Sequence, residues 1–150
     1  MKNITLFVLS VVLLSCGTRK NVTKDEQSDS TEKPKETMII ATLGEFSKTS
    51  DPITISSVQV DGNFMTIEVT YSGGCGDHSF QMIGSSMIAK LLPPIRAIQL
   101  VHNANKDECK KMMIQTIKVD LSALAYKKES GSEIYLTLEG WKEKVKYTFE

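Results

Sequence analysis

Hydrophobic and polar residues alternate along most of the chain after residue 53, which is typical of β strands with one buried face. The clearest case is Phe64–Tyr71, in which every second residue is apolar or aromatic, namely Met65, Ile67, Val69 and Tyr71. Similar patterns predict strands at 53–60, 78–82, 95–102, 113–121, 134–138 and 145–149. Asp61-Gly62-Asn63 separates two of them and predicts a hairpin turn, because Asp-Gly suits the positive φ angles of a tight turn.

The spacing of these segments predicts an all-β domain, a single antiparallel β-sandwich or small barrel of about six to eight strands. A short apolar run at 38–43 is expected to form its first strand, so the domain is placed at residues 38–150. At most one short helix is expected, near 84–92, where Pro93-Pro94 would end it.

The first 15 residues have the pattern of a signal peptide, with one lysine followed by the apolar run 4–14. The following Leu13-Leu14-Ser15-Cys16 resembles the lipobox of bacterial lipoproteins. That resemblance implies cleavage before Cys16, lipidation of its thiol and a lipid-anchored position in the cell envelope, with the outer membrane as the expected site. The alternatives are an ordinary secretory signal, in which Cys16 is incidental, and an uncleaved anchor.

Residues 16–37 are expected to be the lipidated cysteine and a disordered tether. The stretch 17–37 contains five basic and five acidic side chains but a single large apolar residue, Val22, too little to form a core. A coil of that length spans about 25 Å on average. Asp29-Ser30-Thr31 is similar to the O-glycosylation motif of Bacteroidetes, which would make Ser30 a glycosylation site, and Lys24-Asp25-Glu26-Gln27 is similar to the charged segment of surface-exposed lipoproteins from that phylum. The alternative for both is a solvated run of charges.

The overall charge of the chain argues against a nucleic-acid partner. Eighteen Lys and Arg balance 18 Asp and Glu, so the chain lacks the basic excess that a general nucleic-acid binder needs. We therefore expect no nucleic-acid partner. The expected partners are the lipid bilayer, through Cys16, and an envelope protein.

The candidate chemistry is concentrated in four residues. After Cys16 the chain has only two cysteines, Cys75 and Cys109, and in all only two histidines, His78 and His102. Outside the reducing cytoplasm the cysteines are expected to form a disulfide, which could join predicted strands across the sandwich. The same four residues are also a Cys2His2 set for zinc or copper. A third reading is a hydrolase or thiol redox enzyme that uses Cys75 and His78.

The segment Tyr71–Phe80, followed by Leu100-Val101-His102-Asn103 and Cys109, resembles small lipid-anchored β proteins of Bacteroidetes, and the sandwich domain of NigD-like lipoproteins in particular. The resemblance implies a β-sandwich with a cysteine pair and brings no catalytic residue. We therefore expect an extracytoplasmic binding or envelope accessory protein with no catalysis and no cofactor. The alternatives are the zinc- or copper-binding protein and the cysteine enzyme.

Overall fold

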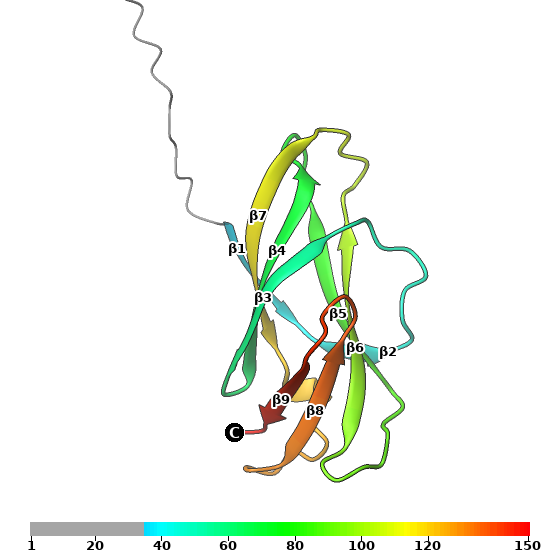
Figure 1. The fold of residues 1–150 in the computed structure, drawn as a ribbon, viewed down its shortest axis with the longest axis vertical. Helices are drawn as coiled ribbons and strands as arrows, with labels where there is room; N and C mark the ends of the chain where they lie inside the picture. The colour runs from blue at the N-terminus through cyan, green and yellow to red at the C-terminus, as the bar shows by residue number, and fades with distance from the viewer. Residues whose placement is uncertain (1–34) are drawn as a thin grey trace, which may run out of the picture. The chain divides into compact units, whose positions relative to one another are not determined.

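The computed structural model describes residues 35–150, so Cys16, Ser30 and the predicted signal peptide lie outside the described residues. The described part is all-β, with nine strands in two sheets (Figure 1). The strands are β1 Lys35–Ile40, β2 Thr42–Gly44, β3 Thr54–Asp61, β4 Phe64–Gly73, β5 Ser79–Ser85, β6 Ile95–Asn103, β7 Lys111–Asp120, β8 Glu133–Leu138 and β9 Lys144–Thr148. From residue 35 onward no helix has the length and hydrophobicity needed to cross a membrane.

The strands form a four-stranded sheet of order β1-β7-β4-β3 and a five-stranded sheet of order β2-β5-β6-β8-β9. Most neighbours are antiparallel, whereas β1–β7, β2–β5 and β6–β8 are parallel. The all-β sandwich expected from the sequence is therefore confirmed, but it has nine strands in place of about six to eight, and both sheets contain parallel pairs besides the antiparallel ones.

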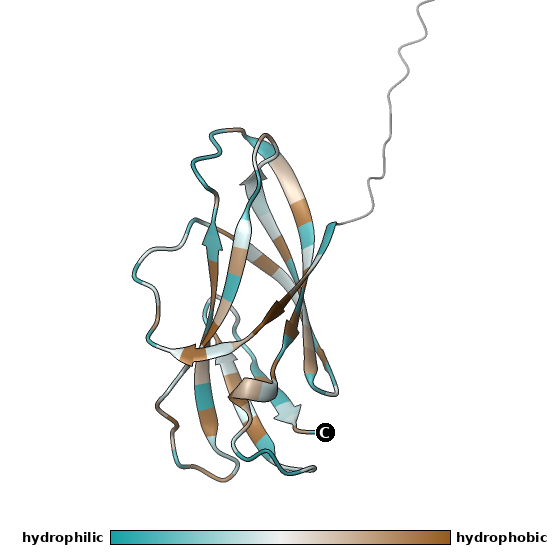
Figure 2. Ribbon diagram, turned by 180° about the vertical axis from the view of Figure 1, so that it is seen from behind, coloured by the Kyte–Doolittle hydropathy of each residue, from teal (hydrophilic) through white to brown (hydrophobic). Residues whose placement is uncertain are grey.

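The alternation seen in the sequence places the core between the two sheets (Figure 2). In β4 the residues Met65, Ile67 and Val69 are completely buried, and their polar neighbours point outward. The neighbouring strand β7 adds the buried Ile117 and Val119. The facing sheet contributes further buried side chains, among them Met82, Ile98, Leu100, Ile134 and Leu136. The Asp61-Gly62-Asn63 turn forms as predicted, and Gly62 has a φ of 53°.

Two expectations about individual elements need correction. No helix forms at 84–92: Gly84 and Ser85 end β5, and the loop returns to β6 through backbone hydrogen bonds in both directions between Ala89 and Ile95. The only helical turn in the described residues is a 3-10 turn at Ser122–Leu124. The strand expected at 38–43 is divided at the buried Ala41, because the chain passes there from one sheet to the other.

The predicted tether also ends earlier than expected. β1 begins at Lys35, which pairs with Gln115 of β7, so residues 35–37 belong to the sheet. Polar composition suggested a coil for Lys35, Glu36 and Thr37, but a strand at a sheet edge needs only one buried face.

Candidate functional site

The candidate site lies at the end of the sandwich where β4 ends and β7 begins, at the top of Figure 1. The last pair of the β4–β7 ladder is Gly73 with Lys111. Continuing this register by two residues on each strand brings Cys75 opposite Cys109, and these two residues form a disulfide with a Cα–Cα distance of 5.9 Å. The disulfide therefore joins neighbouring strands of one sheet and does not cross the sandwich as the sequence suggested.

The carboxylate of Asp107 accepts backbone hydrogen bonds from both cysteines of the disulfide. Its Oδ2 accepts hydrogen bonds from the backbone N–H groups of Cys75 and Gly76, both at 2.9 Å, and its Oδ1 accepts one from the backbone N–H of Cys109, also at 2.9 Å. These backbone donors, from Cys109, Cys75 and Gly76, hold the pKa of the Asp107 carboxyl well below its usual range, and His78 adds to the effect. Asp107 is therefore ionised at neutral pH.

The two histidines continue inward from Asp107. His78 Nε2 lies 3.2 Å from Asp107 Oδ2, and His78 Nδ1 lies 2.8 Å from His102 Nε2. The side chains of His78 and Asp107 are only 2% and 1% exposed, so this contact is shielded from solvent. The result is a buried row of three polar side chains running from the disulfide toward the core.

The ionised carboxylate determines where the imidazole protons lie. Asp107 only accepts, so His78 carries a proton on Nε2, and a neutral His78 then accepts at Nδ1 from His102 Nε2–H. This leaves His102 Nδ1 unprotonated and, among the described residues, without a hydrogen-bond partner. Burial lowers the pKa of His102, and the nearby backbone of Asp51 and Pro52 opposes the effect without completing a bond to Nδ1.

Aromatic rings enclose the histidine pair. Phe80, the cross-strand neighbour of His102, stacks on it with ring centroids 4.8 Å apart, and the Tyr71 ring lies 4.6 Å from the ring of His78. Burial, with a smaller contribution from the Asp107 charge, raises the pKa of the Tyr71 hydroxyl. That hydroxyl donates to Gln115 Oε1 at 2.6 Å, and Gln115 Nε2 donates to Thr37 Oγ1 in β1.

Gly73 makes the close packing possible. A Cβ atom at this position would lie 2.6 Å from both Cε1 and Nε2 of His78, closer than van der Waals contact permits. The glycine-rich segment Gly73-Gly74-Cys75-Gly76 is thus explained in part by the imidazole that packs against the end of β4.

The structure brings all four of the residues singled out in the sequence to one end of the sandwich, but in two layers. The sulfur atoms of Cys75 and Cys109 are bonded to each other, and the imidazoles contact each other and Asp107. The four residues of the predicted Cys2His2 set therefore do not converge on one metal position in this structure. Neither Cys75 nor Cys109 has a free thiol that could act as a nucleophile. Asp107 was missed, because it lies in the polar segment between the predicted strands 95–102 and 113–121, and its position two residues before Cys109 was the available signal.

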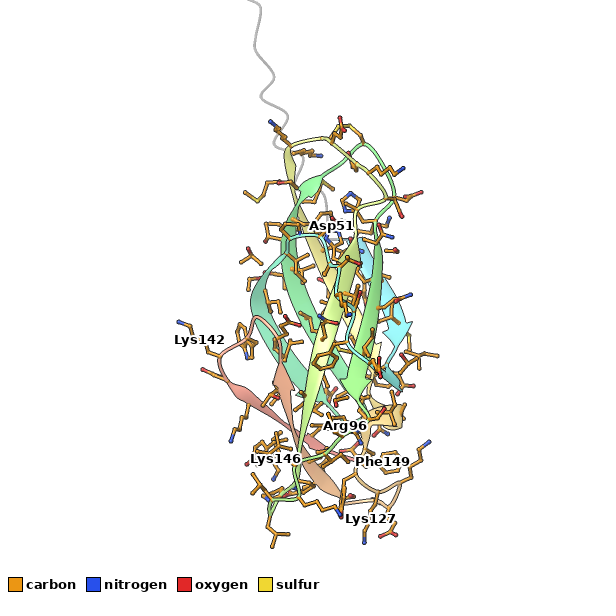
Figure 3. All side chains as sticks on the ribbon, turned by 90° about the vertical axis from the view of Figure 1, so that its right-hand side faces the viewer. Asp51, Arg96, Lys127, Lys142, Lys146 and Phe149 are labelled. Atoms are coloured by element: carbon orange, nitrogen blue, oxygen red, sulfur yellow. A yellow bond between two sulfur atoms is a disulfide. The ribbon has the colours of Figure 1, made fainter. Side chains whose placement is uncertain are left out.

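A shallow polar hollow of about 470 Å³ lies beside this end, between β5, β6 and the β2–β3 loop. Gln99 holds that loop in place, since its side-chain amide bonds both the N–H and the carbonyl of Ser47. Figure 3 shows the labelled Asp51 on this loop, far from Arg96. The hollow is lined by Ser47, Lys48, Thr49, Ser50, Asp51, Ser79, Gln81, Val101, His102 and Asn103.

Comparison with known families agrees with this architecture. The model of the NigD-like C-terminal beta sandwich domain matches residues 25–150. The chain belongs to this family. Comparison with curated proteins gave no significant match.

Two solved structures resemble this NigD-like domain. A NigD-like immunity protein from Bacteroides caccae superposes with a TM-score of 0.59 at 14% identity, over 75% of this chain and 64% of the other. A protein of unknown function from Bacteroides vulgatus superposes with a TM-score of 0.50 at 12% identity, over 78% of this chain and 57% of the other. The chain thus spans less than two thirds of either protein, and at these identities the likeness concerns the fold.

Proposed function

We propose that this chain is a lipid-anchored envelope protein whose NigD-like sandwich acts as a binding or accessory module without catalysis of its own. Cys16 would carry the lipid, and the segment up to β1 would connect it to the domain. The description of the Bacteroides caccae relative as an immunity protein makes an immunity role one form that this function would take.

The proposal that the domain has no catalytic activity rests on how its candidate catalytic residues are engaged. In residues 35–150 both cysteines are used in one disulfide, and the His78 and His102 side chains are buried beneath it. A nucleophile or general base must reach the group with which it reacts. Instead, the two histidines and Asp107 contact one another. The Asp107 carboxylate also accepts hydrogen bonds from the backbone of both cysteines.

The disulfide also supports the location. Disulfides persist in the envelope and outside the cell but are rare in the reducing cytoplasm. An apolar run at 4–14 followed at once by Ser15-Cys16 supplies both an export signal and a lipid attachment point. The two features are separate in the chain and favour the same compartment.

Lipidation is tested by expressing the full chain in a Bacteroidetes host fed with a labelled fatty acid. We expect the wild-type chain to be labelled, to partition with membranes and to have a mass consistent with cleavage before Cys16. Cys16→Ser should abolish labelling, whereas Gly17→Ala, one residue further on, should leave it intact. An unlabelled wild-type chain, or one cleaved elsewhere, would overturn the proposed anchor.

A further inference from the structure

The disulfide and Asp107 form a compact group of potential metal ligands. The two sulfur atoms and a carboxylate oxygen of Asp107 all lie within 4.8 Å of one another. While the sulfurs are bonded to each other they offer no thiolate, so the group is closed to metals in the oxidised protein. Reduction would convert the same atoms into two thiolates and a carboxylate.

The fold would hold these ligands in place without the S–S bond. Cys75 and Cys109 lie two residues beyond the end of the β4–β7 ladder, whose ten residue pairs run without interruption from Phe64–Asp120 to Gly73–Lys111. Asp107 has further contacts that do not involve sulfur, to the backbone N–H of Gly76 and to His78 Nε2. The separation of the three ligands is thus fixed by the backbone around them.

One oxygen of Asp107 has fewer hydrogen bonds than the other. Its Oδ2 accepts three hydrogen bonds, from Cys75, Gly76 and His78, whereas Oδ1 accepts only the one from Cys109. Oδ1 therefore keeps more capacity than Oδ2 to accept a further partner such as a cation. The His78 ring donates to the other oxygen, and carboxylates that bind metals are generally hydrogen-bonded in this way.

We propose that the reduced protein binds zinc through Cys75 Sγ, Cys109 Sγ and Asp107 Oδ1, with His78 as a positioning residue on the carboxylate. Two thiolates and one oxygen suit zinc, and a water molecule completes a tetrahedron. His102 is not a ligand, because its Nε2 is directed at His78. This site differs from the Cys2His2 set predicted from the sequence and depends on the redox state of the protein.

The chemistry requires an external dithiol. One thiolate of the dithiol attacks one of the two sulfurs and forms a mixed disulfide, and its second thiol then displaces the protein thiol. The dithiol is oxidised by two electrons to a cyclic disulfide, and the S–S bond of the protein is reduced to two thiols. Zinc then replaces the two thiol protons, which are released to solvent. Cys75 is exposed, so a dithiol can reach it.

Either closure, the disulfide or the zinc ion, would join the same two strand ends. The domain would therefore keep this end of the sandwich closed under oxidising and reducing conditions alike. A free thiol pair above the ionised Asp107 would arise only when both a disulfide and zinc are absent.

The test uses the full chain with Cys16→Ser, so that Cys75 and Cys109 are its only thiols. The protein is reduced with a dithiol, separated from it without oxygen and titrated with Zn²⁺ alone or with Co²⁺ as a coloured probe. We expect one tightly bound zinc per chain and a thiolate-to-cobalt charge-transfer band from the reduced protein, and neither from the oxidised protein.

Two matched variants identify the ligands. Asp107→Asn should weaken zinc binding by about 10-fold or more, whereas Glu108→Gln, the neighbouring acidic residue, should leave it unchanged. The double variant Cys75→Ser/Cys109→Ser should lose binding. The proposal is overturned if the reduced protein binds no zinc, if Asp107→Asn and Glu108→Gln bind equally well, or if circular dichroism shows that reduction alone unfolds the domain.

Discussion

The two ends of the sandwich bury polar side chains in different ways. At the disulfide end an ionised carboxylate, two imidazoles and a covalent bond share one buried cluster. At the opposite end Arg96 is 3% exposed and has no carboxylate partner among the described residues (Figure 3). Its Nε donates to the carbonyl of Leu124 at 3.1 Å and its Nη1 to the carbonyl of Ser85.

Packing closes the Arg96 end. Leu124 is fully buried, and a Cβ atom on Gly84 would collide with its side chain. The 3-10 turn that carries Leu124 is held by Asp120, whose Oδ1 accepts hydrogen bonds from both the N–H and the hydroxyl of Ser122. Burial lowers the pKa of the Arg96 guanidinium, as expected for a cation that has only neutral carbonyls as partners.

The comparison shows that the disulfide end depends on a covalent bond and a charge, whereas the Arg96 end depends on apolar contacts and the main chain. Changes in redox state and pH should therefore act mainly on the first end. Changes in side-chain volume should act mainly on the second, except where Gly73 touches His78.

Removing the covalent bond should have the largest effect. We expect Cys75→Ala/Cys109→Ala to lower the free energy of unfolding by about 4 kcal/mol, because the bridge closes a loop with a sequence separation of 34 residues. Urea unfolding of the oxidised wild type and the variant measures this difference. Cys16→Ser, which leaves the bridge intact, is the control, and a loss below about 1 kcal/mol would mean that Asp107 and the histidines hold this end without it.

A cavity at the opposite end should come next. Leu124→Ala should cost about 3 kcal/mol of unfolding free energy, because it leaves a void over Gly84 and Arg96. Leu92→Ala removes the same atoms from a fully exposed side chain and should change stability by less than about 0.5 kcal/mol. If the two variants unfolded at the same urea concentration, packing would not be what closes this end.

The sequence predicted the strands near the disulfide end correctly but predicted a helix for the segment 84–92 near the Arg96 end, where none forms. The alternation along β4 and β7 identified the buried faces, because every second residue of a half-buried strand must be apolar. The segment 84–92 has the composition of a helix, but its Leu91 and Leu92 find no core to face and remain exposed. Pairing of Ala89 with Ile95 then satisfies the backbone in a way that depends on residues outside the local pattern.

For the candidate site, the sequence identified the cysteines and histidines but not their arrangement or the role of Asp107. Two cysteines that follow a predicted export signal favoured a disulfide, but their position beyond the ends of neighbouring strands follows from the β4–β7 register, which a single sequence does not display. Asp107 could not be distinguished from other loop acids, because its role arises from three backbone donors that converge only after folding. The contact of Gly73 with His78 is likewise a property of the packed structure.

That contact gives the third prediction. Gly73→Ala should cost about 2 kcal/mol, because the new methyl group would displace an imidazole that is fixed by Asp107 on one side and His102 on the other. Gly44→Ala is the matched control in β2, where a Cβ atom would meet Ile83 at an ordinary 3.7 Å. Urea unfolding compares the two. An equal cost for both variants would show that the His78 side chain moves freely.

The smallest effect concerns pH. Burial lowers the pKa of His102 in the folded state, so the unfolded chain, with an ordinary histidine pKa of about 6.5, binds a proton first as the pH falls. Stability should therefore decrease below about pH 6.5, with a slope of at most about 1.4 kcal/mol per pH unit from this group. The titratable groups that face it are His78, Asp51 and Tyr71.

His102→Phe keeps a ring against Phe80 and removes the titrating group, so it should flatten the dependence of unfolding free energy on pH between about pH 7 and pH 5. Asp77→Asn, at an exposed carboxylate, should leave the slope as it is. If the slope persists in His102→Phe, the burial of His102 is not the source of the acid sensitivity between about pH 7 and pH 5, and the comparison of the two ends would have to rest on the disulfide alone.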